Sequence, residues 1–257
     1  MRAFASALAT SLICATSAWA AFPARVVSLN LCTDELLLAL AAPRQISSLT
    51  HLSHDSRESA YWRLAQPYRA NNGTILSVAQ DRPDLIVTMG GGGRDNAGLA
   101  AALGARLLDL PFPSQLADVE AGIRLLAHAL GRGLQGEMLI GQIKAMAANR
   151  PKPKDAVFIG SAGRSMAAHG AGAEWMRLSG LRQIPLRDDR FDREQLLRLP
   201  PVTLLVSNYR IDQYSRTGSL PVRRNRDRQI ETDGRRWTCM GPSLLPEIAR
   251  IRRMVTP

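Results

Sequence analysis

Lysine and cysteine are scarce in this 257-residue chain. Of the 33 basic residues, only Lys144, Lys152 and Lys154 are lysines, so the net charge of +11 comes almost entirely from arginine. Three cysteines are too few for a disulfide-dense miniprotein, and a hydrophobic content of 46% excludes a collagen or an acidic disordered chain. A chain of this length buries a sizeable core, as one large domain or two small ones.

Common catalytic motifs are also missing. The chain contains no G-x-S-x-G, no G-x-x-x-x-G-K-[ST], no H-E-x-x-H, and no G-x-G-x-x-G after its first predicted strand. The run Gly90–Gly93 lacks the lysine and hydroxyl residue of a phosphate loop, which favours a tightly turning loop. His51 and His54 supply at most half of a metal site, so we predict no metal site and no cofactor.

A membrane span needs about 20 apolar residues, and no segment after residue 20 provides them. Residues 1–20 have the pattern of a secretory signal peptide: Arg2, an Ala- and Leu-rich stretch, and the cleavage sequence Ala18-Trp19-Ala20. We therefore expect an exported, periplasmic protein without membrane insertion, whose mature chain begins at residue 21.

Export changes the meaning of the cysteines. Removal of the signal peptide removes Cys14 and leaves Cys32 and Cys239. An even pair in an oxidising compartment is a disulfide candidate that would join the two ends of the mature chain. Two separate buried thiols are the alternative, because only geometry decides the pairing.

The positive charge is concentrated in the second half of the chain. Residues 151–257 carry 20 basic and 11 acidic residues, against 13 and 11 in residues 1–150. Such an excess suggests an anionic partner. However, acidic residues interrupt the arginine-rich stretch 216–236, and no nucleic-acid-binding motif accompanies it. A solvated face explains the arginine-rich stretch 216–236 better than nucleic-acid binding does.

Short apolar runs alternate with helical patterns, which predicts parallel sheets flanked by helices. Strands are expected at 25–31, 45–49, 83–89, 106–110, 156–160 and 202–207. Helices are expected at 35–40, 59–68, 75–80, 96–103, 116–130, 133–149, 173–179, 193–197 and 243–253, with a polar loop at 50–55. The fold class is therefore α/β, with two lobes, each a mostly parallel sheet, joined by a long spanning helix. The predicted boundaries are 1–20 signal peptide, 21–115 N-terminal lobe, 116–150 helical connection and 151–257 C-terminal lobe.

Ligands of open α/β sheets bind at the carboxyl ends of the strands. If the two lobes face each other, these ends line one cleft, with glycine-rich backbone, aromatics and arginine. This composition favours a large, partly polar or anionic ligand over a small metal ion. The candidate ligand-binding residues are Asn30, Thr33, Thr50, His51, Trp62, Gly91, Arg94, Phe112, Arg164, His169, Tyr209, Arg210 and Trp237.

Several segments together resemble a known family. They are Arg25-Val-Val-Ser-Leu-Asn-Leu, Pro83-Asp-Leu-Ile-Val, Gly170-Ala-Gly-Ala-Glu-Trp-Met and the closing Trp237-x-Cys-x-Gly-Pro. In this order they resemble the class III periplasmic binding proteins, which serve ABC importers of vitamin B12, ferric siderophores and haem. The segments around Cys32 and Cys239 look closest to the cobalamin-transporter type.

The resemblance implies two rigid lobes, a metal chelate between them, and a monomer that docks on an ABC permease through one acidic residue on each lobe. The C-lobe residue would be Glu194. The N-lobe position, seven residues before Pro83, is Leu76, and nearby Asp81 is the substitute. A corrinoid is the first expectation for the ligand, with a ferric siderophore or haem second.

Two other classes of function stay open at this point. The two-lobed architecture also resembles chelatases, in which His51 or His169 would hold a metal. Alternatively, the 216–236 arginine stretch would serve a surface interaction protein that binds polyanions.

Overall fold

The N-terminal lobe is built on a five-stranded parallel sheet. The computed structural model describes residues 22–256 except 92, 191–192 and 210–227. The strand order is β3-β2-β1-β4-β5, and every neighbouring pair is parallel. The strands are β1 (Val26–Ser28), β2 (Ile46–Thr50), β3 (Arg69–Asn71), β4 (Leu85–Met89) and β5 (Arg106–Leu110). The helices are α1 (Leu31–Leu40), α2 (His51–His54), α3 (Trp62–Ala65), α4 (Ile75–Val78) and α5 (Gly93–Ala102).

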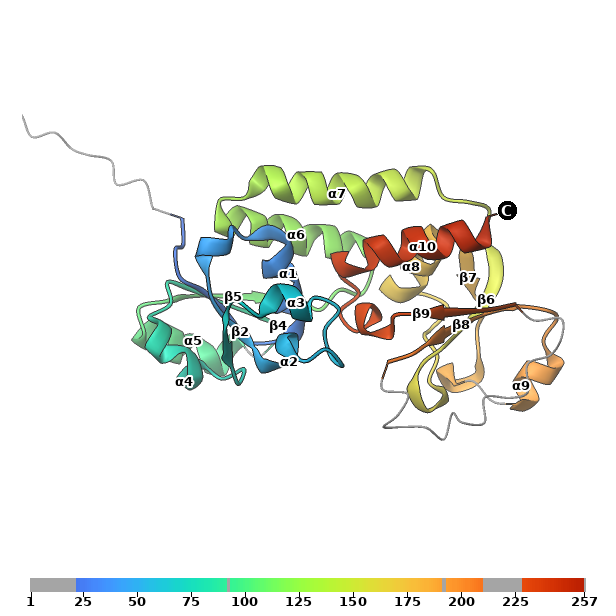
Figure 1. Cartoon of the computed structure of the whole chain (residues 1–257), viewed down its shortest axis with the longest axis horizontal. Helices are drawn as coiled ribbons and strands as arrows, with labels where there is room; N and C mark the ends of the chain where they lie inside the picture. Colours follow the sequence, from blue (N-terminus) through green and yellow to red (C-terminus); the bar gives the residue numbers. More distant parts are fainter. Residues whose placement is uncertain (1–21, 92, 191–192, 210–227, 257) are drawn as a thin grey trace, which may run out of the picture.

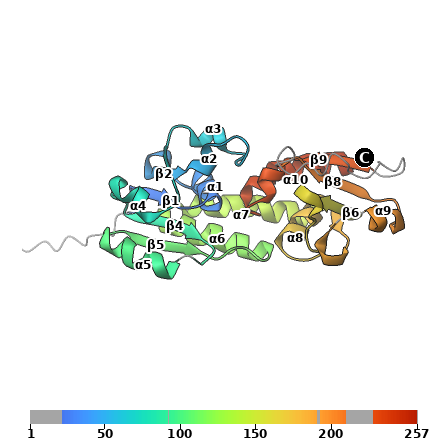
Figure 2. The same ribbon diagram turned by 90° about the horizontal axis from the view of Figure 1, so that it is seen from below.

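The C-terminal lobe repeats this logic with four strands in the order β7-β6-β8-β9, again parallel throughout. The strands are β6 (Lys154–Ile159), β7 (Leu181–Gln183), β8 (Thr203–Ser207) and β9 (Arg228–Thr232). The helices are α8 (Ala171–Leu178), α9 (Arg193–Arg198) and α10 (Leu245–Val255). Figure 1 shows the two lobes side by side, and Figure 2 shows from below that the sheets remain separate. The predicted α/β class with two lobes is confirmed.

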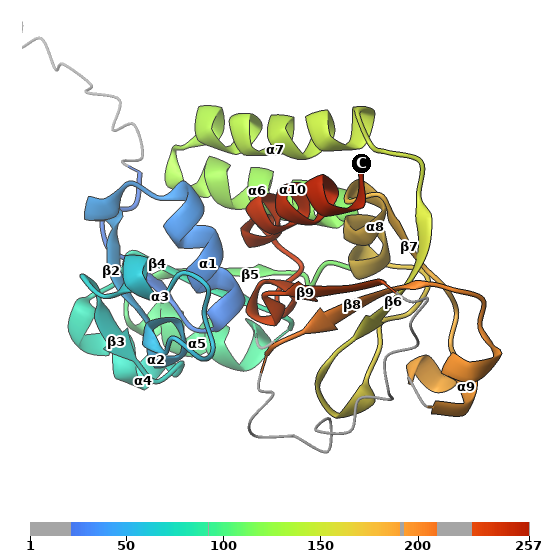
Figure 3. The same ribbon diagram turned by 45° about the vertical axis from the view of Figure 1, so that its right-hand side comes forward.

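Two antiparallel helices, α6 (Leu116–Leu130) and α7 (Gly133–Ala148), connect the lobes. Figures 1 and 3 show both helices running along one side of the molecule, over the two lobes. The start of α6 is bonded to the C-lobe, since the Leu116 amide donates to Glu174 Oε2 at 2.5 Å. Its end is bonded to the N-lobe, where Gln45 Nε2 donates to the Leu130 carbonyl at 3.0 Å. Each helix therefore spans the distance between the lobes.

One continuous apolar cluster runs through both lobes. It contains Leu37 and Leu49 of the N-lobe, Ile123 of α6, and Trp175 and Ile248 of the C-lobe, all at most 1% exposed. Burial of such side chains contributes roughly 1.5–3 kcal/mol each. Because the lobes share this core, their movement relative to each other is restricted on the side of α6, α7 and α10.

Three strands were not predicted from the sequence. β3 and β7 are three-residue edge strands, and β9 has one buried hydrophobic residue, Ile230. The predicted helix 59–68 shortens to α3, because Tyr61 is non-helical and Pro67 has no amide hydrogen to continue the helical hydrogen bonds. The predicted loop 50–55 instead contains α2.

Candidate functional site

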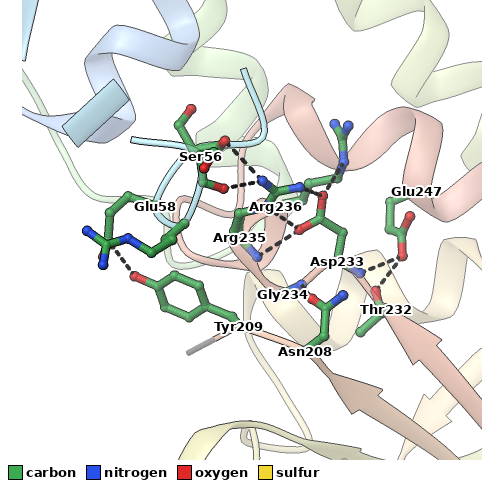
Figure 4. A network of polar contacts seen from close by, with 12 residues as sticks. Ser56, Glu58, Asn208, Tyr209, Thr232, Asp233, Gly234, Arg235, Arg236 and Glu247 are labelled. Carbon is green, nitrogen blue, oxygen red and sulfur yellow. Dashed lines mark hydrogen bonds and ion pairs between the residues drawn. The ribbon is translucent and has the colours of Figure 1, made fainter. Parts of the chain in front are cut away.

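The carboxyl ends of strands from the two lobes face each other. The N-lobe segment 55–61, which follows α2, meets the C-lobe segments that follow β8 and β9 (Figure 4). The Tyr209 hydroxyl donates to Glu58 Oε2 at 2.6 Å. Arg235 Nη1 donates to the Ser59 carbonyl at 3.4 Å and to the Ser56 carbonyl. We call these hydrogen bonds the mouth contacts.

Arg235 is held in place by Asp233. Asp233 caps the short 3₁₀ helix η6 (Gly234–Trp237) by accepting from the Arg235 amide. Its two carboxylate oxygens also accept from Arg235 Nε and Nη2, both at 2.8 Å. Burial alone would raise the pKa of Asp233, but the hydrogen bond from Arg235 and the charges of Arg235 and Arg236 outweigh it and lower that pKa. The pair therefore stays charged, with the guanidinium directed at the N-lobe backbone.

Gly234 makes the close approach of these segments possible. A Cβ at this position would lie 1.8 Å from Ser207 Oγ and 2.6 Å from Tyr209 Cβ. The Gly234 amide donates to Asn208 Oδ1 at 3.2 Å. Thr232 Oγ1 and the Asp233 amide donate to buried Glu247 Oε1 at 2.6 and 3.0 Å, which ties the end of β9 to α10 (Figure 4).

A disulfide joins the lobes next to this region. Cys32 lies in the first turn of α1, and Cys239 lies between η6 and the 3₁₀ helix η7 (Pro242–Leu244). The Cα atoms of the two cysteines are 5.1 Å apart. The predicted pairing is therefore present, and it links the N-lobe to the C-lobe rather than only the two ends of the chain.

A small cavity borders the disulfide. Its volume is about 20 Å³, enough for one water molecule. Its lining comes from the N-lobe, from α6 and from the C-lobe: Cys32, Glu35, Leu36, Met89, Pro111, Pro113, Asp118, Val119, Gly122, Cys239, Gly241 and Pro242. The cavity is far too small for a metal chelate.

Glu35 is the buried ionisable group of this cavity. It is 2% exposed, and neither carboxylate oxygen has a hydrogen-bond partner among the described residues. Burial raises the pKa of Glu35 to about 7, although the nearby Ser243 hydroxyl and the charge of Arg236 oppose this. Burial likewise raises the pKa of neighbouring Asp34 to about 6, against hydrogen bonds from Ser28 and Thr50.

Three predicted ligand-binding residues are buried. Thr33 is fully buried, and its hydroxyl is 2.6 Å from Ser28 Oγ. Thr50 is 1% exposed, and both its amide and its hydroxyl donate to Asp34. Trp237 is 4% exposed, donates to Thr232 Oγ1 at 2.8 Å and packs against Phe158. These three side chains face the interior of the structure, where they form bonds within the protein.

Two further candidates have mainly local contacts. Asn30 is half-buried and caps α1 by accepting a hydrogen bond from the Thr33 amide. His51 is exposed, with Nδ1 3.3 Å from the Asn71 carbonyl, in a shallow depression at the β2–β3 edge.

The other candidates are accessible or lie outside the described side chains. Trp62 and Tyr209 are half-buried, and Gly91, Phe112, Arg164 and His169 are exposed. Arg94 belongs to α5, but its side chain is not among those described, and Arg210 lies outside the described residues. The predicted signal peptide and most of the 216–236 stretch also lie outside the described residues. Within the described part of the chain, no three His, Cys, Asp or Glu residues are placed to hold a metal ion.

The two predicted docking residues differ in their surroundings. Glu194 is exposed on α9 and forms an ion pair with Arg198, one turn later. The Asp81 side chain is only 9% exposed and pairs with Arg69, whose Nε donates at 2.7 Å. Asp81 also accepts from the Ser48 hydroxyl at 2.8 Å. This carboxylate is therefore mostly covered and bonded within its own lobe. Leu76, in contrast, is 77% exposed on α4.

The residues that join the lobes carry no distinctive pattern in the sequence. Glu58 is one of several acids in a polar stretch, and Arg235 falls in an arginine-rich stretch that was interpreted as a solvated face. Glu35 begins the helix expected at 35–40, and an acidic residue is ordinary in the first turn of a helix. The dipeptide Asp233-Gly234 was the available signal, since it is a common turn sequence directly after a strand.

No protein-family model matches the chain, and no curated protein matches its sequence. Solved structures do match it. A periplasmic binding protein from Veillonella parvula is 17% identical with a TM-score of 0.70, covering 90% of this chain and 84% of that one. The periplasmic vitamin B12 binding protein of Vibrio cholerae is 18% identical with a TM-score of 0.60, covering 90% and 96%. The periplasmic haem binding protein HutB of Vibrio cholerae is 19% identical with a TM-score of 0.64, covering 91% and 99%.

The chain therefore has the two-lobed fold of periplasmic binding proteins over nearly its whole length. The two neighbours from Vibrio cholerae are described as binding proteins for vitamin B12 and for haem. Among the described helices, none combines the length and the apolar character that a membrane span requires.

Proposed function

We propose that this protein is the periplasmic substrate-binding component of an ABC importer and has no enzymatic activity of its own. It would be exported through a cleavable signal peptide, bind a metal chelate between its lobes as a monomer, and deliver it to a permease. The observation that carries the proposal is the arrangement of two parallel sheets, whose carboxyl ends meet at the mouth contacts while α6 and α7 join the lobes on another side. Ligands of open α/β folds bind at such strand ends.

The cargo proposed first is a corrinoid, with a ferric siderophore or haem second. Support comes from the neighbours described as vitamin B12 and haem binding proteins. The side chains proposed to contact the cargo are the accessible ones at strand ends: Trp62, Phe112, Arg164, His169 and Tyr209. Aromatic faces and guanidinium groups suit a large, flat and partly anionic chelate.

Docking on the permease is proposed to be asymmetric. Glu194 offers an exposed carboxylate on the C-lobe. The corresponding N-lobe helix, α4, offers Leu76 instead of an acid. An apolar side chain that is this exposed is a candidate for a contact between proteins.

A tryptophan-fluorescence titration of the mature protein tests which chelate it binds. Trp175 and Trp237 are buried in the C-lobe, whereas Trp62 is half-buried, so Trp62 is the expected reporter. We expect saturable one-to-one quenching by cyanocobalamin, measured alongside haemin and a panel of ferric siderophores. In a Trp62→Phe variant the quenching should largely disappear, while calorimetry still detects weaker binding.

The possible outcomes distinguish an error in the proposed ligand from an error in the proposed transport function. Saturation by haemin or a ferric siderophore, but not by cyanocobalamin, would keep the transport function and change the cargo. Absence of binding to every chelate by calorimetry would contradict the proposal.

A further inference from the structure

The disulfide and the mouth contacts made by Arg235 belong to one segment. Residues 233–244 leave β9, approach the N-lobe and return to the C-lobe as α10 (Figure 3). Arg235 of this segment donates to the backbone of the N-lobe segment 55–61, and Cys239 is bonded to Cys32 of α1. We call residues 233–244 the interlobe arm.

The other hydrogen bonds of the arm stay within the C-lobe, although the Arg236 guanidinium also lies over the Tyr61 ring of the N-lobe, 5.9 Å from its centre. Trp237 Nε1 donates to Thr232, Arg236 Nη1 donates to the Ser243 carbonyl at 2.7 Å, and Trp175 Nε1 donates to the Met240 carbonyl at 2.8 Å. The disulfide is therefore the covalent connection that keeps the arm on α1. It is supported there by packing of η7 against that helix.

The polar bonds at the mouth are weak compared with a covalent link. A guanidinium bonded to backbone carbonyls at a partly exposed site contributes modestly, because water competes for the same groups. The arm must be positioned before Arg235 can reach Ser56 and Ser59. Fixing Cys239 only four residues away removes most of the conformational freedom that Arg235 would otherwise lose on binding.

We propose that the Cys32–Cys239 disulfide is a redox-controlled staple that holds the interlobe arm against the N-lobe and thereby keeps the mouth contacts formed. A dithiol reductant opens it. One reductant thiolate bonds to the sulfur of Cys32, the more exposed cysteine of the pair, and the S–S bond breaks with its electron pair passing to Cys239, which takes up a proton. The second reductant thiol then displaces the Cys32 thiol, and the reductant leaves as a disulfide.

Reduction should release the arm but should not separate the lobes. The shared apolar cluster and helices α6 and α7 contain neither cysteine, so they keep the lobes joined. The expected change is local: faster opening of the mouth contacts, with the helical side unchanged.

Hydrogen–deuterium exchange of the mature wild-type protein, with and without dithiothreitol, tests the proposal. Complete reduction is verified by titrating two thiols. We expect amide exchange in segments 55–61 and 233–239 to accelerate by about tenfold or more on reduction, while exchange in α6 and α7 stays the same. The Cys32→Ala/Cys239→Ala variant should resemble the reduced wild type and should not respond to dithiothreitol.

Two results would overturn the proposal. Unchanged exchange in both segments after complete reduction would mean that the staple does not control the mouth. An equal acceleration throughout the chain would mean that the disulfide only stabilises the whole fold. If the double variant does not fold, the wild-type comparison still decides, because the mature chain is expected to contain no other cysteine. No ligand is used, so the result is independent of the proposed transport function.

Discussion

Glu35 places an unpartnered carboxyl group at the boundary between the lobes. A buried charge without hydrogen bonds is costly, so the folded state holds this proton to a higher pH than the unfolded chain does. Its pKa is raised from 4.5 to about 7, which means that the folded state binds more protons than the unfolded state between these pH values. The contribution of Glu35 to stability is therefore most favourable below pH 4.5 and becomes less favourable as pH rises through 7.

Replacing Glu35 with Gln should remove this pH dependence. We expect the Glu35→Gln variant to gain stability relative to wild type as pH rises from 5 to 8, by on the order of 3 kcal/mol at most. Chemical denaturation at several pH values measures the difference. Glu194→Gln, which alters an exposed glutamate, serves as the control and should follow the wild-type profile. Parallel profiles for wild type and Glu35→Gln would contradict the prediction.

The three buried ligand candidates show that the position of a residue in the chain does not reveal which way its side chain points. Thr33 and Thr50 were chosen because they lie at or near the ends of predicted strands, and that placement in the chain is correct. The direction of each side chain depends on neighbours that are distant in sequence. Asp34 receives both hydrogen bonds of Thr50, and Phe158 covers the Trp237 ring.

Two glycines of helix α7 have opposite surroundings. A Cβ on Gly136 would lie 2.6 Å from Ala127 Cβ of α6, so this glycine permits close packing of the two helices. A Cβ on Gly141 would meet nothing within 4 Å. From sequence, both glycines look like equal weaknesses of the helix.

Alanine substitutions at these glycines should therefore change stability in opposite directions. Gly141→Ala should stabilise the protein by about 1 kcal/mol, because alanine restricts the unfolded chain and favours the helix. Gly136→Ala should destabilise it by about 1–3 kcal/mol, because the helices must move apart. Urea denaturation measures both. Stabilisation by both variants would show that α6 and α7 tolerate the separation.

Arginine side chains also connect helix ends in the C-lobe. Arg252 of α10 donates to the Leu178 carbonyl, at the end of α8, and to the Met146 carbonyl at 2.8 Å, near the end of α7. Lys154 donates to the Val255 carbonyl at 2.9 Å, at the end of α10. Cations at helix C-termini are favourable because carbonyl groups there are unsatisfied. Part of the basic excess of this lobe thus has a structural role.

Loss of the Arg252 guanidinium should be costly. We expect Arg252→Met to destabilise the protein by about 2 kcal/mol, since carbonyls at the ends of two helices lose a charged donor. The control is Arg253→Met, at the exposed neighbouring position, which should change stability by less than about 0.5 kcal/mol. Equal effects of the two variants in urea denaturation would refute this role.

At the scale of the whole molecule, two kinds of noncovalent contact join the lobes, in addition to the Cys32–Cys239 disulfide. Apolar packing around α6, α7 and α10 is continuous, whereas the mouth is closed by polar bonds between backbone carbonyls and Arg235 and between Tyr209 and Glu58. Polar bonds that water can replace open more easily than an apolar core. Movement should therefore occur as a limited opening at the mouth.

Removing the Arg235 side chain should favour that opening. We expect Arg235→Met to increase the radius of gyration in small-angle X-ray scattering, with only a small loss of thermal stability, because the bonds lost are partly exposed. The matched control is Arg25→Met, which breaks an ion pair with Asp84 inside the N-lobe and should leave the scattering curve unchanged. Identical curves for Arg235→Met and wild type would contradict the expected opening.

The sequence by itself determined the class of fold, the approximate positions of most helices and strands, and the pairing candidate Cys32 and Cys239. These features depend on local periodicity, on turn residues and on the number of cysteines, all of which are visible along the chain. The boundaries of β5 and α6 were predicted correctly because a strand and a long amphipathic helix carry strong local patterns.

Only the tertiary structure decided which side chains are buried and that the disulfide joins the two lobes. It also decided that Arg235 bonds to the N-lobe backbone and that Glu58 accepts from Tyr209. Residues 58 and 235 belong to different lobes, and their proximity results from the packing of α6, α7 and α10. Likewise, Asp81 became an internal ion-pair partner because β3 brings Arg69 beside it. Such contacts depend on the summed geometry of many elements, which no local pattern in the sequence encodes.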